Sequence, residues 1–267
     1  MLFSIKLMGF GDLFSKSWKE YKGNFKPIFF LMLIFVGIPL TVVNIYGARF
    51  FIENRDLLLS LQNAEGSVVA GQLFSSSPEL VFALLALSVI SILLLIFVQA
   101  GLIEVGMKKE KYSFKEIISG AKGKYWKFLG FIIVLAIFLV LLTILLIIPA
   151  IIFLVYWIFA TYILFEGKKG IIGSLKESFA LVRGKWWKVF GYSLLLLVII
   201  IAVNFVFGLI ALPASLDSGF DPIEFSEGSF KLGVVLSIIS KFLGNLFAIP
   251  FSIIFYKNFY FSLRKKK

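Results

Sequence analysis

The chain has 267 residues, of which 60% are hydrophobic and 17% are aromatic, with 32 Phe. A soluble domain is roughly 45–50% apolar and about 25% charged. Only 16% of this chain is charged, so its composition excludes a water-soluble globule and indicates a multi-pass membrane protein.

Six segments are apolar enough to cross the hydrocarbon core of a bilayer, which takes about 20 helical residues. In chain order they are Pro27–Gly47, Leu80–Ile103, Phe128–Ile148, Ala150–Phe165, Val189–Leu212 and Leu232–Tyr256. The third and fourth lie within Phe128–Phe165, which has no formal charge over 38 residues. Pro149 lies near its middle, where we expect a chain reversal; the alternative is one very long, tilted helix.

The formal net charge of +12 divides unequally when the loops are assigned to alternate sides of these spans. One side carries 23 Lys and Arg against seven acids, and the other carries three against eight. The first set is 1–26, 104–127, 166–188 and 257–267, and the second is 48–79 and 213–231. Cytoplasmic loops are enriched in Lys and Arg, so we predict a multi-pass protein of the cell membrane with both termini cytoplasmic.

A short pattern of a basic residue, Gly, a polar residue and an aromatic residue occurs three times, each time just before a span. The copies are Lys22–Lys26, Lys122–Gly130 and Arg183–Gly191. An amphipathic stretch precedes each copy, and the Gly can take the positive φ that ends a helix. We therefore predict three repeat units, each an interfacial helix followed by a helical hairpin; chance similarity of Lys-aromatic membrane edges is the alternative.

Together these features predict an all-α fold, in which one membrane domain over 1–267 forms a polytopic helical bundle. The bundle has six transmembrane helices, three cytoplasmic interfacial amphipathic helices and a three-unit internal repeat. The repeat units cover about 9–107, 113–168 and 171–262.

This arrangement resembles the integral-membrane domain that precedes the catalytic domain in some glycerophosphodiester phosphodiesterases. It is also similar to stand-alone six-span prokaryotic membrane proteins without an assigned function. The residues that carry the resemblance are Gly11–Phe25 with the Ser17-Trp18 pair, Ser174–Gly191, and the ending Pro250, Tyr256, Tyr260 and Leu263. The phosphodiesterase barrel uses His and carboxylates, and this chain has no His and no room for a barrel. The resemblance therefore implies the membrane part alone, without phosphodiesterase activity.

The sequence contains no His and no Cys. This excludes disulfides, thiolate nucleophiles, His-based triads and most zinc and haem sites. The commonest general base near neutral pH is missing too, and no Asp or Glu lies within a predicted span. We therefore expect a non-catalytic protein without a metal or a cofactor.

Polar side chains at membrane depth are the default functional candidates. Asn44, Thr143 and Asn204 lie 20 or 21 residues after the Gly of their repeat copy, and Asn245 reaches a similar depth. These side chains either converge on a small polar cavity or hydrogen-bond neighbouring helices as packing contacts, and we favour packing. We expect Lys241 near the outer membrane interface, where its ammonium group snorkels into water; a buried partner is the alternative.

Basic residues of the repeat copies and of the C-terminal tail form a predicted belt on the cytoplasmic side. Each Lys or Arg near an anionic leaflet contributes about 1 kcal/mol of attraction. The belt is either a topology signal with general lipid attraction or a specific surface for anionic headgroups or an unidentified protein partner. Its members are Lys22, Lys26, Lys122, Lys124, Lys127, Arg183, Lys185, Lys188, Arg264 and Lys265.

The belt favours a protein that organises or interacts with membrane lipids, with anionic headgroups of the cytoplasmic leaflet as its partners. The alternative is a transporter or lipid-translocating permease with a small polar cavity between repeat units, because repeats are frequent in transport folds. An intramembrane enzyme fits least well. We expect no nucleic-acid partner, because the sequence has no basic soluble domain with aromatic residues for base stacking.

Overall fold

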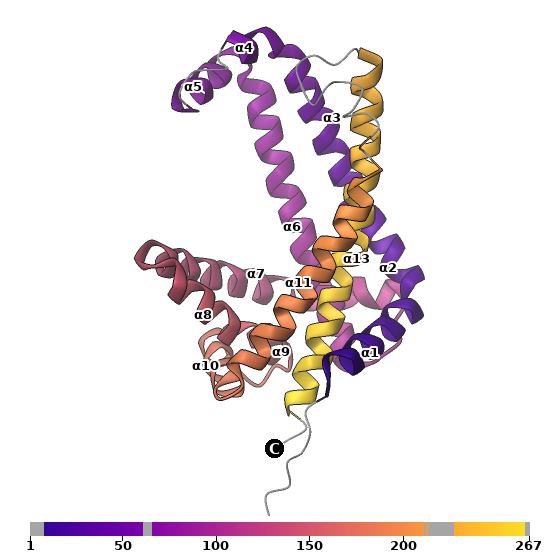
Figure 1. Ribbon diagram of the computed structural model, residues 1–267, viewed down its shortest axis with the longest axis vertical. Helices are drawn as coiled ribbons and strands as arrows, with labels where there is room; N and C mark the ends of the chain where they lie inside the picture. Colours follow the sequence, from indigo (N-terminus) through magenta and orange to yellow (C-terminus); the bar gives the residue numbers. More distant parts are fainter. Residues whose placement is uncertain (1–7, 61–65, 211, 213–226, 265–267) are drawn as a thin grey trace, which may run out of the picture. The chain divides into compact units, whose positions relative to one another are not determined.

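The computed structural model describes residues 8–60, 66–210, 212 and 227–264. Every regular element in this part of the chain is a helix (Figure 1), which confirms the predicted all-α class. The elements are α1 (Phe10–Gly23), α2 (Phe25–Met32), the π-helix η1 (Leu33–Gly37), α3 (Ile38–Glu53), α4 (Arg55–Ser60), α5 (Gly66–Ser76), α6 (Pro78–Lys108), α7 (Phe114–Leu145), α8 (Ile147–Trp157), α9 (Ala160–Phe165), α10 (Ile171–Val182), α11 (Trp186–Gly208) and α13 (Glu227–Arg264).

Five helical stretches of the described chain are long and apolar enough to cross a membrane. They are Phe25–Phe50, Pro78–Lys108, Phe114–Leu145, Trp186–Gly208 and Leu232–Arg264. Only 11–22% of the residues in their apolar windows are buried inside the protein, so most of this apolar surface faces outward. Exposure of such a large apolar surface to water is unfavourable, whereas contact with lipid is not. This is expected for a multi-pass membrane protein.

The predicted fourth span, Ala150–Phe165, is not one helix, because it is divided between α8 and α9 by a turn at Ile158 and Phe159. The 11 residues of α8 rise about 16 Å, roughly half the thickness of the hydrocarbon core. The chain reversal is present, but it occurs at the extended residue Leu146. Pro149 lies in the first turn of α8, where its missing N–H leaves no helical hydrogen bond unmade.

The predicted glycine corners differ from one repeat copy to the next. Gly184 has a φ of +79° and separates α10 from α11, as predicted. The corner at Gly123 is wrong, because α7 continues through it without a break. At the first copy the turn is made by Asn24, which has a φ of −116°, so Gly23 remains the last residue of α1.

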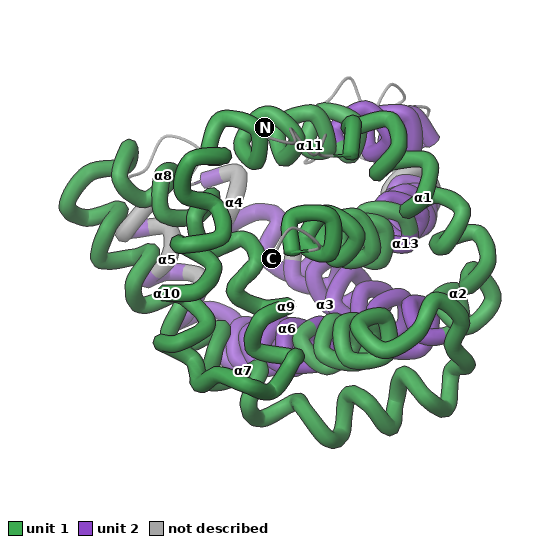
Figure 2. Tube along the Cα trace, turned by 90° about the horizontal axis from the view of Figure 1, so that it is seen from below, with its two compact units in different colours: residues 1–30, 96–200, 247–267 green, residues 31–95, 201–246 purple. Residues whose placement is uncertain are grey.

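The chain contacts divide the protein into two compact units (Figure 2). Unit 1 contains residues 1–30, 96–200 and 247–267, and unit 2 contains 31–95 and 201–246. Both units are assembled from separated segments, because α2, α6, α11 and α13 contribute residues to each of them. Their boundaries differ from those of the three predicted repeat units, which stay a prediction.

The core of unit 1 is built on aromatic side chains from the C-terminal part of α13. Phe251, Phe255 and Phe259 are at most 1% exposed. The Phe251 ring contacts Phe14 of α1, with 5.1 Å between centroids, and Phe259 contacts Phe159 at 5.3 Å. These contacts join α1, α13 and the turn between α8 and α9 in one core.

Helices α6 and α7 pack closely in unit 1 because small residues face the contact. A Cβ added at Gly101 would lie 2.6 Å from the carbonyl oxygen of Ile117, and one at Gly120 would lie 3.1 Å from Cγ of Glu104. Real Cβ atoms do not approach a backbone oxygen so closely. The absence of side chains at both glycines therefore brings the two helix backbones together, as at many helix contacts in membranes.

Unit 2 contains a comparable close contact between α11 and α13. A Cβ added at Gly244 would lie 2.1 Å from Oδ1 of Asn204, so the amide of Asn204 occupies the space that a side chain at Gly244 would need. Gly37, at the end of η1, lies in the same way against the ring of Phe242. Glycines thus set the spacing of helices within unit 2 as they do within unit 1.

Candidate functional site

The predicted basic belt lies in unit 1, apart from Lys265, which lies outside the described residues. The ammonium group of Lys22 lies 5.5 Å from the ring centroid of Trp18, and that of Lys188 lies 5.3 Å from the ring of Tyr192. The exposed members are Lys22, Lys26, Lys122, Lys127 and Arg183, and the half-buried members are Lys124, Lys185, Lys188 and Arg264.

Two tryptophans of the repeat copies are among the most exposed large side chains of unit 1. Trp126 is 76% exposed and Trp187 is 78% exposed, and each is followed within one residue by a lysine of the belt. Trp prefers the headgroup level of a bilayer, where its ring is in an apolar environment and its N–H reaches water. The combination is typical of a membrane interface.

Three residues of the belt line one cavity of about 260 Å³, which we call the Arg264 cavity. Arg183 and Lys185 come from the turn between α10 and α11, and Arg264 comes from the end of α13. Glu177 and Tyr260 provide further polar lining. The fold therefore brings the third repeat copy and the C-terminal tail together, as far as the tail is described.

Much of the charge of Arg264 is neutralised by acidic neighbours. Its guanidinium forms an ion pair with Glu166, contacts the hydroxyl oxygen of Tyr260, and lies 4.0 Å from Glu177. The Tyr260 hydroxyl donates a hydrogen bond of 2.8 Å to Glu166. Arg183 and Lys185 add two further basic side chains to the lining of this cavity.

A second and larger cavity, of about 410 Å³, lies between α1 and the segment that connects α6 to α7. We call it the α1 cavity. Its lining residues are Lys16, Lys19, Glu20, Gly23, Asn24, Glu110 and Lys111. None of its three lysines belongs to the predicted belt, so the sequence pattern missed them.

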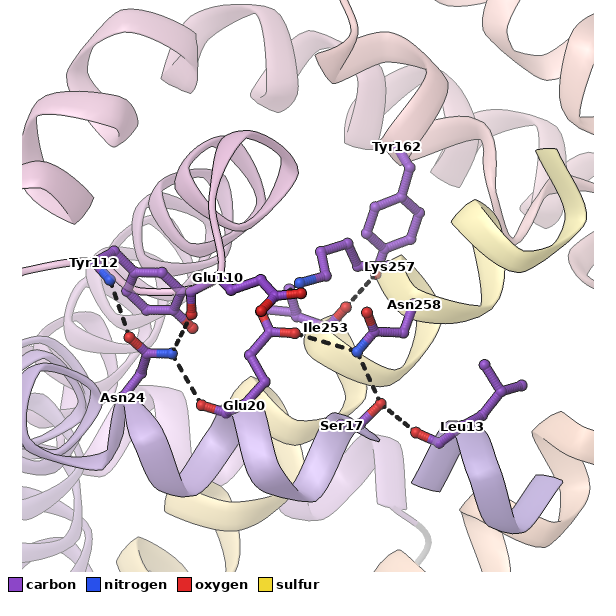
Figure 3. Close-up of polar contacts among 10 residues, drawn as sticks. All are labelled: Leu13, Ser17, Glu20, Asn24, Glu110, Tyr112, Tyr162, Ile253, Lys257 and Asn258. Atoms are coloured by element: carbon purple, nitrogen blue, oxygen red, sulfur yellow. Dashed lines mark hydrogen bonds and ion pairs between the residues drawn. The ribbon is translucent and has the colours of Figure 1, made fainter. Parts of the chain in front are cut away.

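A buried polar network between α1 and α13 adjoins the α1 cavity through Glu20, which is one of its lining residues (Figure 3). Glu20 and Lys257 form an ion pair in which each side chain is only 5% exposed. The amide of Asn258 donates to the second carboxylate oxygen of Glu20 at 3.2 Å and to the hydroxyl of Ser17 at 3.1 Å. Both oxygens of the Glu20 carboxylate thus have partners, as a buried charge requires.

Asn24 fixes the segment on the other side of the α1 cavity. Its amide nitrogen donates to the carbonyl oxygen of Glu110 at 2.7 Å, and its amide oxygen accepts from the backbone N–H of Tyr112 at 3.0 Å (Figure 3). Burial raises the pKa of Tyr21 to about 12, and burial together with the nearby Glu20 raises the pKa of Tyr112. Both phenols therefore stay neutral at physiological pH.

The predicted intramembrane polar residues separate into two groups. Asn44, Asn204, Lys241 and Asn245 lie in unit 2, whereas Thr143 lies in unit 1, where it is exposed and donates to Leu139 of its own helix at 2.8 Å. Lys241 donates to Oδ1 of Asn44 at 3.1 Å, and its side chain is exposed. This bond joins α13 to α3, and Asn204 contacts α13 at Gly244; the choice between packing and a polar cavity stays a prediction.

The buried network is the part of the site that the sequence did not reveal. Glu20 is buried, because its side chain faces α13 and not the solvent. Ser17, Glu20 and Asn24 follow at spacings of three and four residues, so they share a helix face. That spacing is the local signal; the partner pair Lys257 and Asn258 has none.

Comparison with known proteins identifies a family but no activity. A family model described as a domain of unknown function (DUF7847) matches residues 80–259. No curated protein and no solved structure matches the chain. In the described residues no group of three or more acidic side chains could hold a metal ion.

Proposed function

The chain belongs to the DUF7847 family, and from this premise we propose that it is a non-catalytic multi-pass membrane protein that binds anionic lipid headgroups at a basic cytoplasmic face. The observation that carries the proposal is the Arg264 cavity, where Arg183 and Lys185 meet Arg264 from a distant segment. A cavity of about 260 Å³ has room for a headgroup, and the basic side chains of its lining supply the attraction.

The proposal includes the topology that the charge distribution predicts, with both termini in the cytoplasm. We infer that α7 and the α8–α9 pair enter the membrane and return to the same side as a hairpin, completing six membrane segments. At the tip of the hairpin Ile144, Leu145 and Ile148 are 70–76% exposed, which suits contact with lipid. The N–H of Leu146 bonds to the carbonyl of Leu142 at 2.9 Å, so this donor is satisfied without water.

We further propose that α1 and α10 are interfacial helices of a three-unit repeat, in which the second interfacial helix is fused with its span as α7. Their buried faces carry Leu13 and Leu175, and basic residues lie on exposed positions. The resemblance to the membrane domain of some glycerophosphodiester phosphodiesterases agrees with this architecture and remains part of the proposal.

Single cysteines test the topology, because the natural chain has no Cys to interfere. Lys111→Cys and Lys169→Cys flank the hairpin, and Gly71→Cys lies on the opposite predicted side. We expect a membrane-impermeant thiol reagent to label the first two from the cytoplasmic side and the third from outside. Labelling of Lys111→Cys and Lys169→Cys from opposite sides would refute the hairpin.

Lipid binding is tested on the purified full chain in a neutral detergent, titrated with phosphatidylglycerol or phosphatidylcholine and followed by thermal unfolding. A ligand that binds the native state at 100 times its Kd stabilises by about 2.7 kcal/mol. We expect phosphatidylglycerol to stabilise more than phosphatidylcholine, and Arg183→Gln/Lys185→Gln to lose the difference. Lys168→Gln/Lys169→Gln removes the same charge from exposed positions and should retain it; equal behaviour of both variants would refute the cavity as the site.

A permease is the second candidate, and the hydrogen bond between Lys241 and Asn44 favours it. The π-helix η1 lies on the same membrane segment as Asn44, and such irregular turns occur often at functional sites. If the protein is a permease, Asn204→Leu and Asn245→Leu should abolish uptake by proteoliposomes that the natural chain supports. Absence of uptake by the natural chain would leave lipid binding as the better proposal.

A further inference from the structure

The α1 cavity is larger than the Arg264 cavity and is lined by three lysines, and the proposed lipid binding at the Arg264 cavity does not involve it. We propose that it is a second binding site, which recognises a phosphate group carried by a membrane lipid or by a soluble phosphate ester. It shares no lining residue with the Arg264 cavity, so this inference goes beyond the proposed function and does not depend on it.

The three lysines that line the cavity have no carboxylate partner among the described residues. Lys16 and Lys19 project from the exposed side of α1, and Lys111 comes from the segment between α6 and α7. In contrast to Arg264, no ion pair with a described carboxylate neutralises them. Like charges around one cavity repel one another, so a bound anion relieves that repulsion and gains attraction from all three.

The acidic lining residues do not cancel this excess. Glu20 is already paired, since its two carboxylate oxygens are bound by Lys257 and Asn258. Glu110 is exposed, and its backbone carbonyl is held by Asn24. With the Glu20–Lys257 pair taken as neutral, three cations face a single uncompensated carboxylate, and the cavity is positive.

A phosphate group suits this arrangement better than a carboxylate does. It carries up to two negative charges and three or more acceptor oxygens, and Lys is a common phosphate ligand because its ammonium acts as a compact point charge. The cavity volume of about 410 Å³ falls within the usual range of small-molecule sites and exceeds what one phosphate fills. The remaining space accommodates the alcohol part of an ester.

The walls of the cavity are held in place before any ligand binds. Asn24 ties the 109–113 segment to the end of α1 through two hydrogen bonds, to Glu110 and to Tyr112. The Glu20–Lys257 pair ties α1 to α13, and Glu20 is itself part of the cavity lining. A site that is already formed loses little conformational entropy when it binds its ligand.

The test measures binding of three probes to the full chain in neutral detergent: glycerol 3-phosphate, short-chain phosphatidic acid, and glycerol as the neutral control. We expect Lys16→Gln/Lys111→Gln to weaken binding of the phosphate probes by about tenfold or more, because it removes charged hydrogen-bond donors. Lys168→Gln/Lys169→Gln loses the same charge at exposed positions and should bind as the natural chain does. Glycerol should bind to none of them.

The two sources of the phosphate are distinguished by the probes. Binding of phosphatidic acid alone identifies a lipid, binding of glycerol 3-phosphate alone identifies a soluble ester, and binding of both shows that the site accepts the phosphate group from either source. A second variant reverses the expected sign: Glu110→Gln removes the uncompensated carboxylate, so it should tighten binding by a few-fold. Its backbone carbonyl, which Asn24 binds, is unchanged.

Two results would overturn the inference. One is that neither phosphate probe binds the natural chain; the other is that the Lys16→Gln/Lys111→Gln variant and its control bind equally well. Failure here is distinguishable from failure of the lipid proposal, because the phosphatidylglycerol preference is assigned to Arg183 and Lys185. It should therefore survive in Lys16→Gln/Lys111→Gln.

Discussion

Replacing Lys257 by Met removes one partner of a buried ion pair and leaves the other without its counter-charge. The carboxylate of Glu20 would keep the amide of Asn258, at 3.2 Å, as a donor. Its side chain is only 5% exposed, so water replaces the missing ammonium group poorly. Removing one member of a buried pair costs about 3–5 kcal/mol, and we expect a loss of stability in this range.

The double variant Glu20→Gln/Lys257→Met separates the value of the pair from the cost of an unpaired charge. It removes both charges, and Gln can still accept a hydrogen bond from Asn258. Replacement of a whole buried pair by neutral residues is often nearly neutral. We therefore expect the double variant to be more stable than Lys257→Met alone, with a coupling free energy of about 3 kcal/mol.

Thermal unfolding of the four proteins of this cycle, followed by Trp fluorescence in detergent, measures the coupling. A loss of 3–5 kcal/mol corresponds to a decrease in Tm of about 6–20 °C at this chain length. Lys109→Met is the control, because its pair with Glu116 is 44% and 45% exposed and should contribute about 1 kcal/mol or less. If Lys257→Met decreases Tm no more than Lys109→Met does, the pair is not buried as described and the reasoning fails.

Three glycine substitutions give further expected outcomes in the same unfolding assay. Gly101→Ala should lower the free energy of unfolding by about 1–3 kcal/mol, because its Cβ would lie 2.6 Å from the carbonyl oxygen of Ile117. Unchanged stability would mean that α6 and α7 are farther apart. Gly184→Ala should lose about 1–2 kcal/mol, because φ there is +79°, and unchanged stability would argue against that turn. Gly123→Ala should raise the free energy of unfolding by about 0.5–1 kcal/mol, because Gly123 is helical and no neighbouring atom lies within 4 Å of the new Cβ. A decrease in stability would contradict the continuous helix α7.

Length and composition were sufficient to predict the five helices that are long and apolar enough to cross a membrane, because a long uncharged apolar run has few alternatives to such a helix. The fourth span shows where that reasoning stops. Phe159 and Ala160, at the turn between α8 and α9, are fully buried, and the Phe159 ring contacts Phe259 of α13. The break in the helix thus coincides with a tertiary contact that the local sequence does not display.

The repeat copies show the same limit with nearly identical local sequences. Lys122-Gly123-Lys124 continues a helix, whereas Arg183-Gly184-Lys185 ends one. In α7 the buried residues Ile117 and Phe128 lie on both sides of Gly123, so one continuous axis packs both. After α10 the chain turns at Gly184. The indole N–H of Trp186, at the start of α11, then donates to the carbonyl of Ile152 in α8 at 3.3 Å. Packing partners, and not the glycine itself, decide between the two.

In unit 1 a basic residue that is paired with an acid attracts an anion less than an unpaired one does. This difference separates the two proposed binding cavities. Arg264 belongs to the predicted belt, but Glu166 and Glu177 neutralise much of its charge. Arg264→Gln should therefore decrease the stability of the protein more than it weakens lipid binding. Lys16 and Lys111 belong to no motif, yet they line the larger cavity without a carboxylate partner among the described residues. A motif marks where basic residues recur along the chain. Whether they attract an anion depends on the acids that the fold places beside them, and those pairs join residues up to 237 positions apart.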